Sequence, residues 1–363
     1  MNGQHNIHRH PVKLRRRSPN LRLPQGATRK RDQEVDPENT VTPGPSWWRR
    51  LPWKLIVSGC LLGAIYTGVR WSSLLARLEN VSLAGFVFLL ALYAIGQLLS
   101  ALKWKLFVCS AGLERSTASV VRAYFFGMFV NVFGLGTLGG DVARSLAIRP
   151  NPGQRAAAVV SVVADRVHGL LVLLAIGVTS LAILQPAGLT RLAPTLLAGG
   201  SLSLVTIIAA WWQGPKLVKR FVSENSQVGR VLLPLADAFP RDGSRLLVAS
   251  ALSLAAHNVQ LLMHVVMAAE LGAPLTIPEL YSTVPFVNIG SCVPVSFMGV
   301  GVREALYSVL FSPLGVPLEV SVAFGALWLL VTTHVNALGA LAITSEDRRA
   351  IAGRASRSSR AWC

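Results

Sequence analysis

The chain alternates between long apolar stretches and short polar ones, and eight apolar segments stand out. Several of them run for more than about 18 residues without a charged side chain, which is the length and composition of a helix that crosses a membrane. The eight segments span residues 55–69, 80–102, 123–140, 156–184, 192–212, 246–269, 280–302 and 320–344. This pattern predicts an all-α polytopic membrane protein.

The composition agrees with this prediction. Apolar residues make up 52% of the 363 residues and charged residues only 14%, against about 25% charged residues in an ordinary soluble domain. The charges also gather at the ends, because residues 1–54 carry 12 Lys and Arg against four Asp and Glu. We therefore exclude a soluble enzyme and expect three regions: a disordered basic tail at 1–51, a membrane region at 52–344 and a second basic tail at 345–363.

The first tail contains two dense basic runs, at residues 15–17 and 29–31. A basic run directly before a membrane span is typical of a segment that lies on anionic lipid. No aromatic residues are interleaved with the runs and no nucleic-acid-binding fold accompanies them, so we do not expect a nucleic acid as partner.

Lys and Arg in the loops indicate the side of the membrane, because cytoplasmic loops are enriched in these residues. Both tails and loop 213–245 are basic, and loops 103–116 and 144–155 are mildly so. If all eight segments cross, loop 213–245 falls outside the cell despite its six Lys and Arg. If 117–148 and 280–315 instead enter and leave by the same face, every basic loop is cytoplasmic. We expect this second arrangement: about six full spans, two re-entrant or broken segments, and both termini in the cytoplasm.

The two glycine-rich segments echo each other. Residues 129–132 read Phe-Val-Asn-Val and residues 286–289 read Phe-Val-Asn-Ile, and each run leads through a Gly-rich stretch to an arginine, Arg144 or Arg303. Inverted repeats in transporters bring broken helices together near the membrane midplane in this way. Chance also explains four matching residues, so both explanations stay open. If the repeat is real, Asn131 should lie near Asn288.

Ionisable side chains inside apolar segments are the candidate functional residues, because each costs about 2.5–3.5 kcal/mol to insert and usually faces a cavity or a partner. Asp141 and Arg144 share a helix face at i, i+3 spacing. The preceding Gly139-Gly140 allows a close backbone approach to a ligand and starts a helix whose free N–H groups attract anions. The alternative is an ion pair that only fixes the turn.

Two further charged pairs lie in the apolar segments. Asp165 and Arg166 lie about 15 Å into their predicted helix, and we expect them to form a pair that either binds a ligand or clamps two helices. Arg303 and Glu304 open the helix after the second Gly-rich break. We expect each of Asp141 and Glu304 to pair with its neighbouring arginine when no lipid is bound.

His257, Gln260 and His264 form one helical stripe, for which interhelical hydrogen bonding is favoured over a proton relay or a metal site. The four cysteines are scattered without metal-ligand or disulfide spacing. We therefore expect no metal and no cofactor.

The run from Arg122 to Gly127, continued by Asn131 and by Gly-Gly-Asp-Val-Ala-Arg at 139–144, resembles the signature of the flippase-like family, the transmembrane region of lysylphosphatidylglycerol synthase. Lys103-Trp104, Asp165-Arg166 and the stretch 294–305 also match its pattern. The resemblance covers about residues 52–344.

The resemblance implies a protein of a prokaryotic cytoplasmic membrane that moves a phospholipid or a lipid-linked headgroup between leaflets, and not an enzyme. Two alternatives are a membrane-embedded lipid-modifying transferase and a scaffold subunit for a lipid or glycan biosynthetic enzyme. Arg144, Arg166 and Arg303 would hold the phosphate. The residues expected at the headgroup site are Asn131, Gly139, Gly140, Asp141, Arg144, Asp165, Arg166, Asn288, Arg303 and Glu304.

Overall fold

The computed structural model describes residues 59–60, 62–63, 67–133, 136–226, 228–293, 296 and 299–342. Within these residues the secondary structure is helical, with no strand. Both predicted tails and most of the first apolar segment, 55–69, lie outside the described residues.

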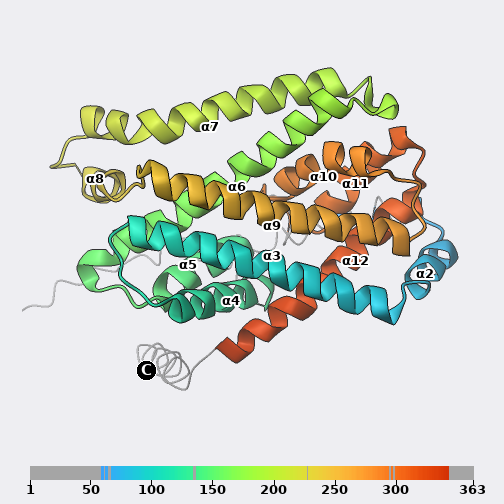
Figure 1. Ribbon diagram of the computed structural model, residues 1–363, viewed down its shortest axis with the longest axis horizontal. Helices are drawn as coiled ribbons and strands as arrows, with labels where there is room; N and C mark the ends of the chain where they lie inside the picture. Colours follow the sequence, from blue (N-terminus) through green and yellow to red (C-terminus); the bar gives the residue numbers. More distant parts are fainter. Residues whose placement is uncertain are drawn as a thin grey trace, which may run out of the picture. The chain divides into compact units, whose positions relative to one another are not determined.

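Five helices are long and apolar enough to cross a membrane, and each coincides with a predicted segment (Figure 1). They are α3 (Leu83–Ser110), α6 (Arg155–Leu184), α7 (Ala193–Phe221), α9 (Gly243–Glu270) and α12 (Leu318–Ala337), the last of which continues as a 3-10 turn. Polar caps fix where two of them begin. The Ser82 hydroxyl accepts the N–H of Gly85 at the start of α3, and the Asp242 carboxylate accepts the N–H of Ser244 at the start of α9.

The other two predicted segments are each broken into two helices. Segment 123–140 becomes α4 (Thr117–Phe133) and α5 (Gly136–Ala147), and segment 280–302 becomes α10 (Ile277–Ser291) and α11 (Val302–Phe311). In both pairs the second helix packs against the first. Gly127 shows how closely: a Cβ atom placed there would lie 2.8 Å from the Gly140 carbonyl oxygen.

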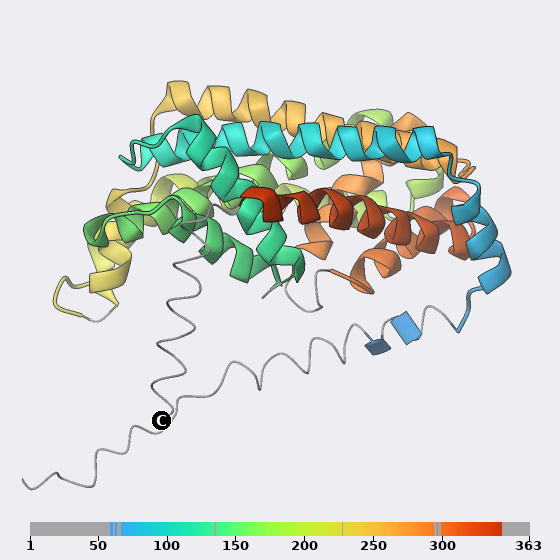
Figure 2. The same ribbon diagram turned by 90° about the horizontal axis from the view of Figure 1, so that it is seen from below.

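Helices α3 and α9 lie side by side along their lengths (Figures 1 and 2). Helix α6 packs against α3, α7 and both broken pairs, while α12 packs against α3, α4 and α11. Helix α7 lies at the periphery of the bundle. Only 6% of its most apolar stretch is buried, against 28–56% of the corresponding stretch in the other four long helices. Two short helices complete the described fold: α2 (Trp71–Glu79) beside α12, and α8 (Gly229–Asp237) beside α7.

The connections gather at two opposite ends of the long helices. At one end, Arg115 donates to the carbonyls of Ile148 and Arg149, which joins the connection after α3 to the one after α5. Phe239, in the connection before α9, stacks on Trp211 at the same end. At the other end, Arg77 of α2 donates to the Leu271 carbonyl.

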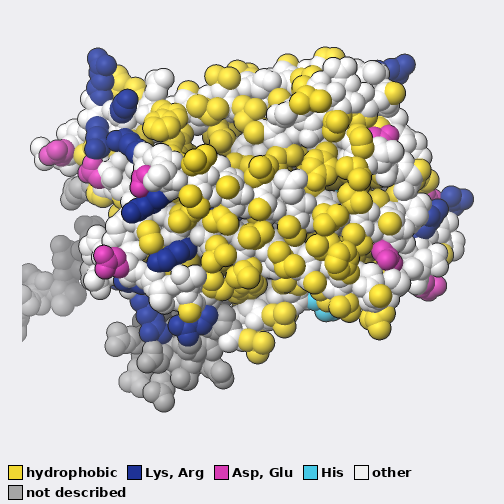
Figure 3. Space-filling model, viewed as in Figure 1, with side chains coloured by type: hydrophobic (Ala, Val, Ile, Leu, Met, Phe, Trp, Pro, Cys, Tyr) yellow, Lys and Arg dark blue, Asp and Glu magenta, His cyan; other side chains and the backbone are white. Residues whose placement is uncertain are grey.

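Each broken pair lies towards a different end. In Figures 1 and 2 the α4–α5 pair lies towards the end that carries Arg115, and the α10–α11 pair towards the opposite end. Figure 3 shows apolar side chains over most of the visible face, with Lys and Arg gathered at the ends and most of them at the end beside α8.

Candidate functional site

Five charged side chains from three helices meet inside the bundle. They are Lys103 of α3, Asp141 and Arg144 of α5, and Asp165 and Arg166 of α6, and we refer to them as the Asp165 cluster. Lys103 Nζ lies 3.0 Å from Asp165 Oδ1, and Arg144 Nη1 lies 2.9 Å from Asp165 Oδ2. Asp141 Oδ1 accepts from Arg144 Nε at 3.1 Å and from Arg166 Nη2 at 2.8 Å.

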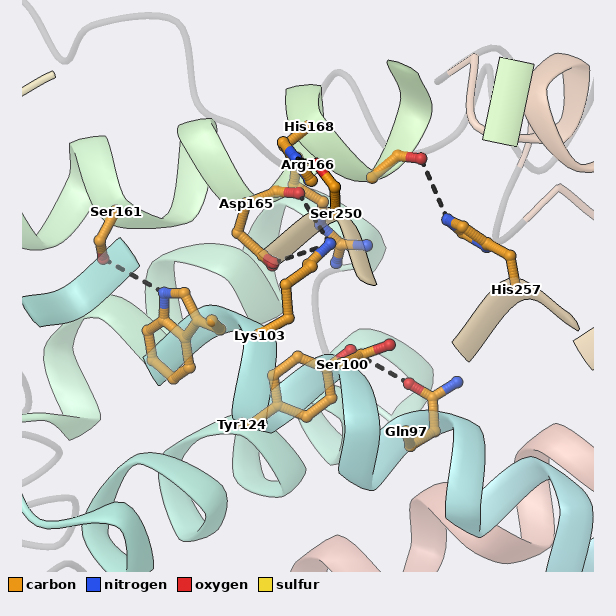
Figure 4. A network of polar contacts seen from close by, with 12 residues as sticks. Gln97, Ser100, Lys103, Tyr124, Ser161, Asp165, Arg166, His168, Ser250 and His257 are labelled. Atoms are coloured by element: carbon orange, nitrogen blue, oxygen red, sulfur yellow. Dashed lines mark hydrogen bonds and ion pairs between the residues drawn. The ribbon is translucent and has the colours of Figure 1, made fainter. Parts of the chain in front are cut away.

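The structure confirms that Asp141 and Arg144 pair along one helix face. It does not show the expected pair within Asp165-Arg166. Consecutive residues on a helix point about 100° apart, so Asp165 turns inward to Lys103 (Figure 4) and to Arg144. Arg166 turns to Asp141 instead.

Aromatic side chains line the cluster. The Arg144 guanidinium lies 4.8 Å from the ring centroid of Trp104 and 5.3 Å from that of Tyr124. The Tyr124 hydroxyl donates to Gln97 Oε1, and the Trp104 indole N–H donates to the Ser161 hydroxyl (Figure 4). The cluster is therefore held rigidly by stacking and hydrogen bonds on the side facing α3 and α4.

The Asp165 cluster has three cations and two carboxylates, a net charge of +1. Arg144 is 3% exposed and Asp165 is 5% exposed, and Asp165 lies about ten residues, or roughly 15 Å, from the start of α6. The Arg144 Nη2 group has no hydrogen-bond partner. A buried donor that lacks an acceptor, in a cluster with excess positive charge, is suited to bind an anion.

Arg166 is the accessible member of the cluster. Its side chain is 47% exposed, against 3% for Arg144. Its guanidinium reaches both oxygens of Asp141. Arg166 is therefore open to the surroundings of the bundle, whereas Arg144 is enclosed by it.

The two glycines before Asp141 do not have the role expected from the sequence, which was to start a helix and to let a ligand approach the backbone. Helix α5 begins at Gly136, so Gly139 and Gly140 lie inside its first turns and do not start the helix. Gly140 faces α4, where a Cβ atom would lie 1.9 Å from Asn131 Oδ1 and 2.2 Å from the Gly127 carbonyl oxygen. Glycine is thus required for close packing of α4 on α5.

A second polar group surrounds Arg303 at the start of α11, and we call it the Arg303 cluster. Arg303 Nη1 donates to Asn288 Oδ1 at 2.7 Å, and its guanidinium lies 3.5 Å from the ring centroid of Trp328. Arg303 is buried, its Nε has no hydrogen-bond partner, and no carboxylate among the described residues forms an ion pair with it. Among the described residues its positive charge is therefore offset by dipoles and a π face.

Glu304 has a different role from the one expected. Its carboxylate accepts the backbone N–H of Gly301 at 2.6 Å and packs against Gly325. It closes the turn before α11 in place of pairing with Arg303, because residues adjacent in a helix face different neighbours.

Asn131 and Asn288 occupy corresponding places. Each lies on the first helix of a broken pair and faces the second helix, at Gly140 and Arg303 respectively. Their expected proximity stays a prediction. The pocket beside α2 lies elsewhere, is apolar and is lined by Leu78, Val81, Leu83, Phe86, Leu327 and Leu330.

The histidines of α9 form interhelical hydrogen bonds. His257 Nε2 lies 3.0 Å from the Gly169 carbonyl oxygen, and His264 Nε2 lies 2.8 Å from the Tyr307 hydroxyl. Among the described residues no group of three or more His, Cys, Asp and Glu side chains is arranged to hold a metal.

Lys103 is the member of the Asp165 cluster that the sequence did not predict. It sits seven residues before the end of α3, within the apolar helix and not in the loop after it. The signal was the apolar run at 106–109, which continues the helix beyond Lys103 to Ser110. A Cβ atom on Gly169 would lie 3.0 Å from Lys103 Nζ, so that glycine leaves room for the ammonium group.

The fold and the buried charges define a multi-pass helical membrane protein with an internal polar site. The pattern of the family described as lysylphosphatidylglycerol synthase TM region matches residues 52–339. Because the match covers most of the chain, the protein belongs to this family, which is related to lipid modification and lipid flipping. No curated protein matched the chain in a search for relatives.

Proposed function

We propose that the protein moves a phospholipid or a lipid-linked headgroup between the leaflets of the cytoplasmic membrane. The observation that carries this proposal is the Asp165 cluster: two buried cations, Lys103 and Arg144, the exposed Arg166, two carboxylates, and an Arg144 donor without an acceptor. A lipid phosphate carries the charge and the oxygen atoms that this arrangement lacks.

The phosphate binds between Arg166 and Arg144, and the acyl chains remain in the bilayer. Arg166 exchanges part of its contact with Asp141 for the phosphate, and Arg144 offers its free Nη2 group. Asp141 bridges the two arginines when no lipid is bound, which limits their mutual repulsion. The Arg303 cluster, with one arginine and no opposing carboxylate among the described residues, provides a second place for phosphate towards the other leaflet.

The proposed membrane topology has two re-entrant pairs. The connections after α3, after α5 and between α7 and α9 all belong to the end that carries Arg115. Their Lys and Arg, leaving aside the buried Lys103 and Arg144, support a cytoplasmic position for that end. The α4–α5 pair then enters from the cytoplasm and the α10–α11 pair from outside. Both termini are cytoplasmic in this arrangement, and the basic tail at 1–51 lies on anionic lipid.

Purified full-length protein reconstituted into liposomes tests the proposal with a panel of fluorescent lipids. A membrane-impermeant quencher measures leaflet exchange, and chromatography of the same lipids measures product formation. We expect exchange of phosphate-bearing lipids with no new product. New product without exchange would favour a transferase, and neither result would favour a scaffold for a biosynthetic enzyme.

A further inference from the structure

The buried face of α9 carries a continuous polar stripe. Ser250, Ser253, His257, Gln260 and His264 follow one another at spacings of three and four residues, which places them on one helix face. The stripe extends 14 residues, about 21 Å, in a hydrocarbon layer about 30 Å thick. Buried histidines in a membrane span are costly and mark ion or proton pathways.

The stripe joins the two clusters. At one end His168 Nε2, next to the Asp165 cluster on α6, lies 3.0 Å from the Ser250 hydroxyl (Figure 4). At the other end the Tyr307 hydroxyl bonds to His264 Nε2, and Tyr307 lies one turn after Arg303 on α11.

The hydrogen bonds fix the tautomers of the two α9 histidines. A carbonyl oxygen only accepts, so His257 Nε2 carries the hydrogen that Gly169 receives, and His264 Nδ1 carries the hydrogen that Gln260 receives. His264 Nε2 is then the acceptor for Tyr307. His257 Nδ1 is left as a buried lone pair without a hydrogen-bond partner, beside the Gln260 side chain.

His257 is not alone in this respect. His168 Nδ1 and the Ser253 hydroxyl are also buried without a partner. Two of these atoms lie on the stripe and the third lies beside it on α6. Buried polar groups are normally satisfied by protein or water, so these atoms mark places open to water or to a proton.

The charged and titratable groups that face His257 are Lys103 from α3 and Asp165 and His168 from α6. A proton on His257 adds a positive charge beside a cluster that already carries +1. An anion bound at that cluster offsets the charge, so phosphate binding and proton binding favour each other, and by linkage the effect is reciprocal.

We propose that His257 takes up a proton when an anionic lipid phosphate binds at the Asp165 cluster, which couples lipid binding to proton uptake. This inference rests on the function proposed above. The proton comes from water, adds to the Nδ1 lone pair to form the imidazolium ion, and returns to water when the phosphate leaves. No bond other than this N–H forms or breaks.

Calorimetry on the purified full-length protein tests the coupling. Dihexanoyl phosphatidylglycerol, a soluble short-chain anionic lipid, is titrated in two buffers of different ionisation enthalpy, and the difference in binding heat gives the protons taken up per lipid. We expect about one proton for the wild type and loss of this uptake in His257→Gln, whose amide still donates to Gly169. His334→Gln is the matched control, since His334 is an exposed histidine in a span, bonded to Leu330 of its own helix. It should take up protons like the wild type.

Lipid binding without proton uptake in the wild type would overturn the coupling, whether or not the variant folds. Uptake that persists in His257→Gln would also overturn the assignment. The proposed function fails separately, if lipid binds with proton uptake but no leaflet exchange is seen in liposomes. Absence of lipid binding would overturn both.

Discussion

Replacing Asp165 by Asn isolates the electrostatics of the buried cluster. The substitution keeps the size of the side chain and removes its charge. Lys103 at 3.0 Å and Arg144 at 2.9 Å lose their shared carboxylate, and the net charge of the cluster rises from +1 to +2. Asp165 is 5% exposed, so water does not replace the lost partner.

The expected loss in the free energy of unfolding is about 3–5 kcal/mol, the usual result of removing one partner from a buried ion pair. This corresponds to roughly two to four powers of ten in the ratio of folded to unfolded protein. The double change Lys103→Met with Asp165→Asn returns the net charge to +1, and we expect it to recover part of the loss.

Unfolding in mixed micelles with increasing sodium dodecyl sulfate measures these differences. Asp237→Asn is the control, because the Lys219–Asp237 pair lies at the surface with side chains 46% and 67% exposed, and its loss should cost less than about 1 kcal/mol. If Asp165→Asn costs no more than Asp237→Asn, the cluster is not a buried network and the reasoning fails.

Three further predictions concern packing, topology and pH. Gly140→Ala should lower stability by about 1–3 kcal/mol through a clash with α4, whereas Gly199→Ala, with nothing within 4 Å, should not; equal effects in a denaturation series would contradict this. A single cysteine at Ser226 should resist an impermeant thiol reagent in intact cells and react after lysis, and labelling from outside would restore eight simple crossings. The Ser244 hydroxyl holds the pKa of the exposed Asp242 carboxyl below its usual value, so stability from this cap is present above about pH 4 and is lost as the pH falls. Asp242→Asn should remove that acid dependence, and an unchanged pH profile of thermal unfolding would refute the assignment.

Much of the fold follows from the sequence because a membrane restricts the choices. Apolar stretches of more than about 18 residues with few or no charges have to form helices there, and five of them did. Glycine and proline interrupted two others, and the structure breaks both of these segments, after Phe133 and after Ser291. The division of each of these two segments into two helices, α4 with α5 and α10 with α11, therefore follows from its glycine-rich interruption.

Which charged side chains pair could not be predicted from the sequence. The pairing depends on how helices far apart in the sequence are rotated against each other. Asp165 and Arg166 are adjacent in the chain, yet a turn of about 100° sends them to different partners. Arg303 and Glu304 separate for the same reason. Lys103 was missed because only the packing of α3 on α6 shows that its ammonium faces Asp165.

The most direct test of the central claim compares leaflet exchange of two labelled lipids that differ in their phosphate: phosphatidylglycerol and glucosyl diacylglycerol. The account predicts exchange of phosphatidylglycerol and little exchange of glucosyl diacylglycerol. The Arg144→Gln variant should lose exchange of phosphatidylglycerol. The control Arg245→Gln, which changes an exposed surface pair with Asp242, should retain it. Equal exchange of both lipids by the wild type, or full exchange of phosphatidylglycerol by Arg144→Gln, would contradict it.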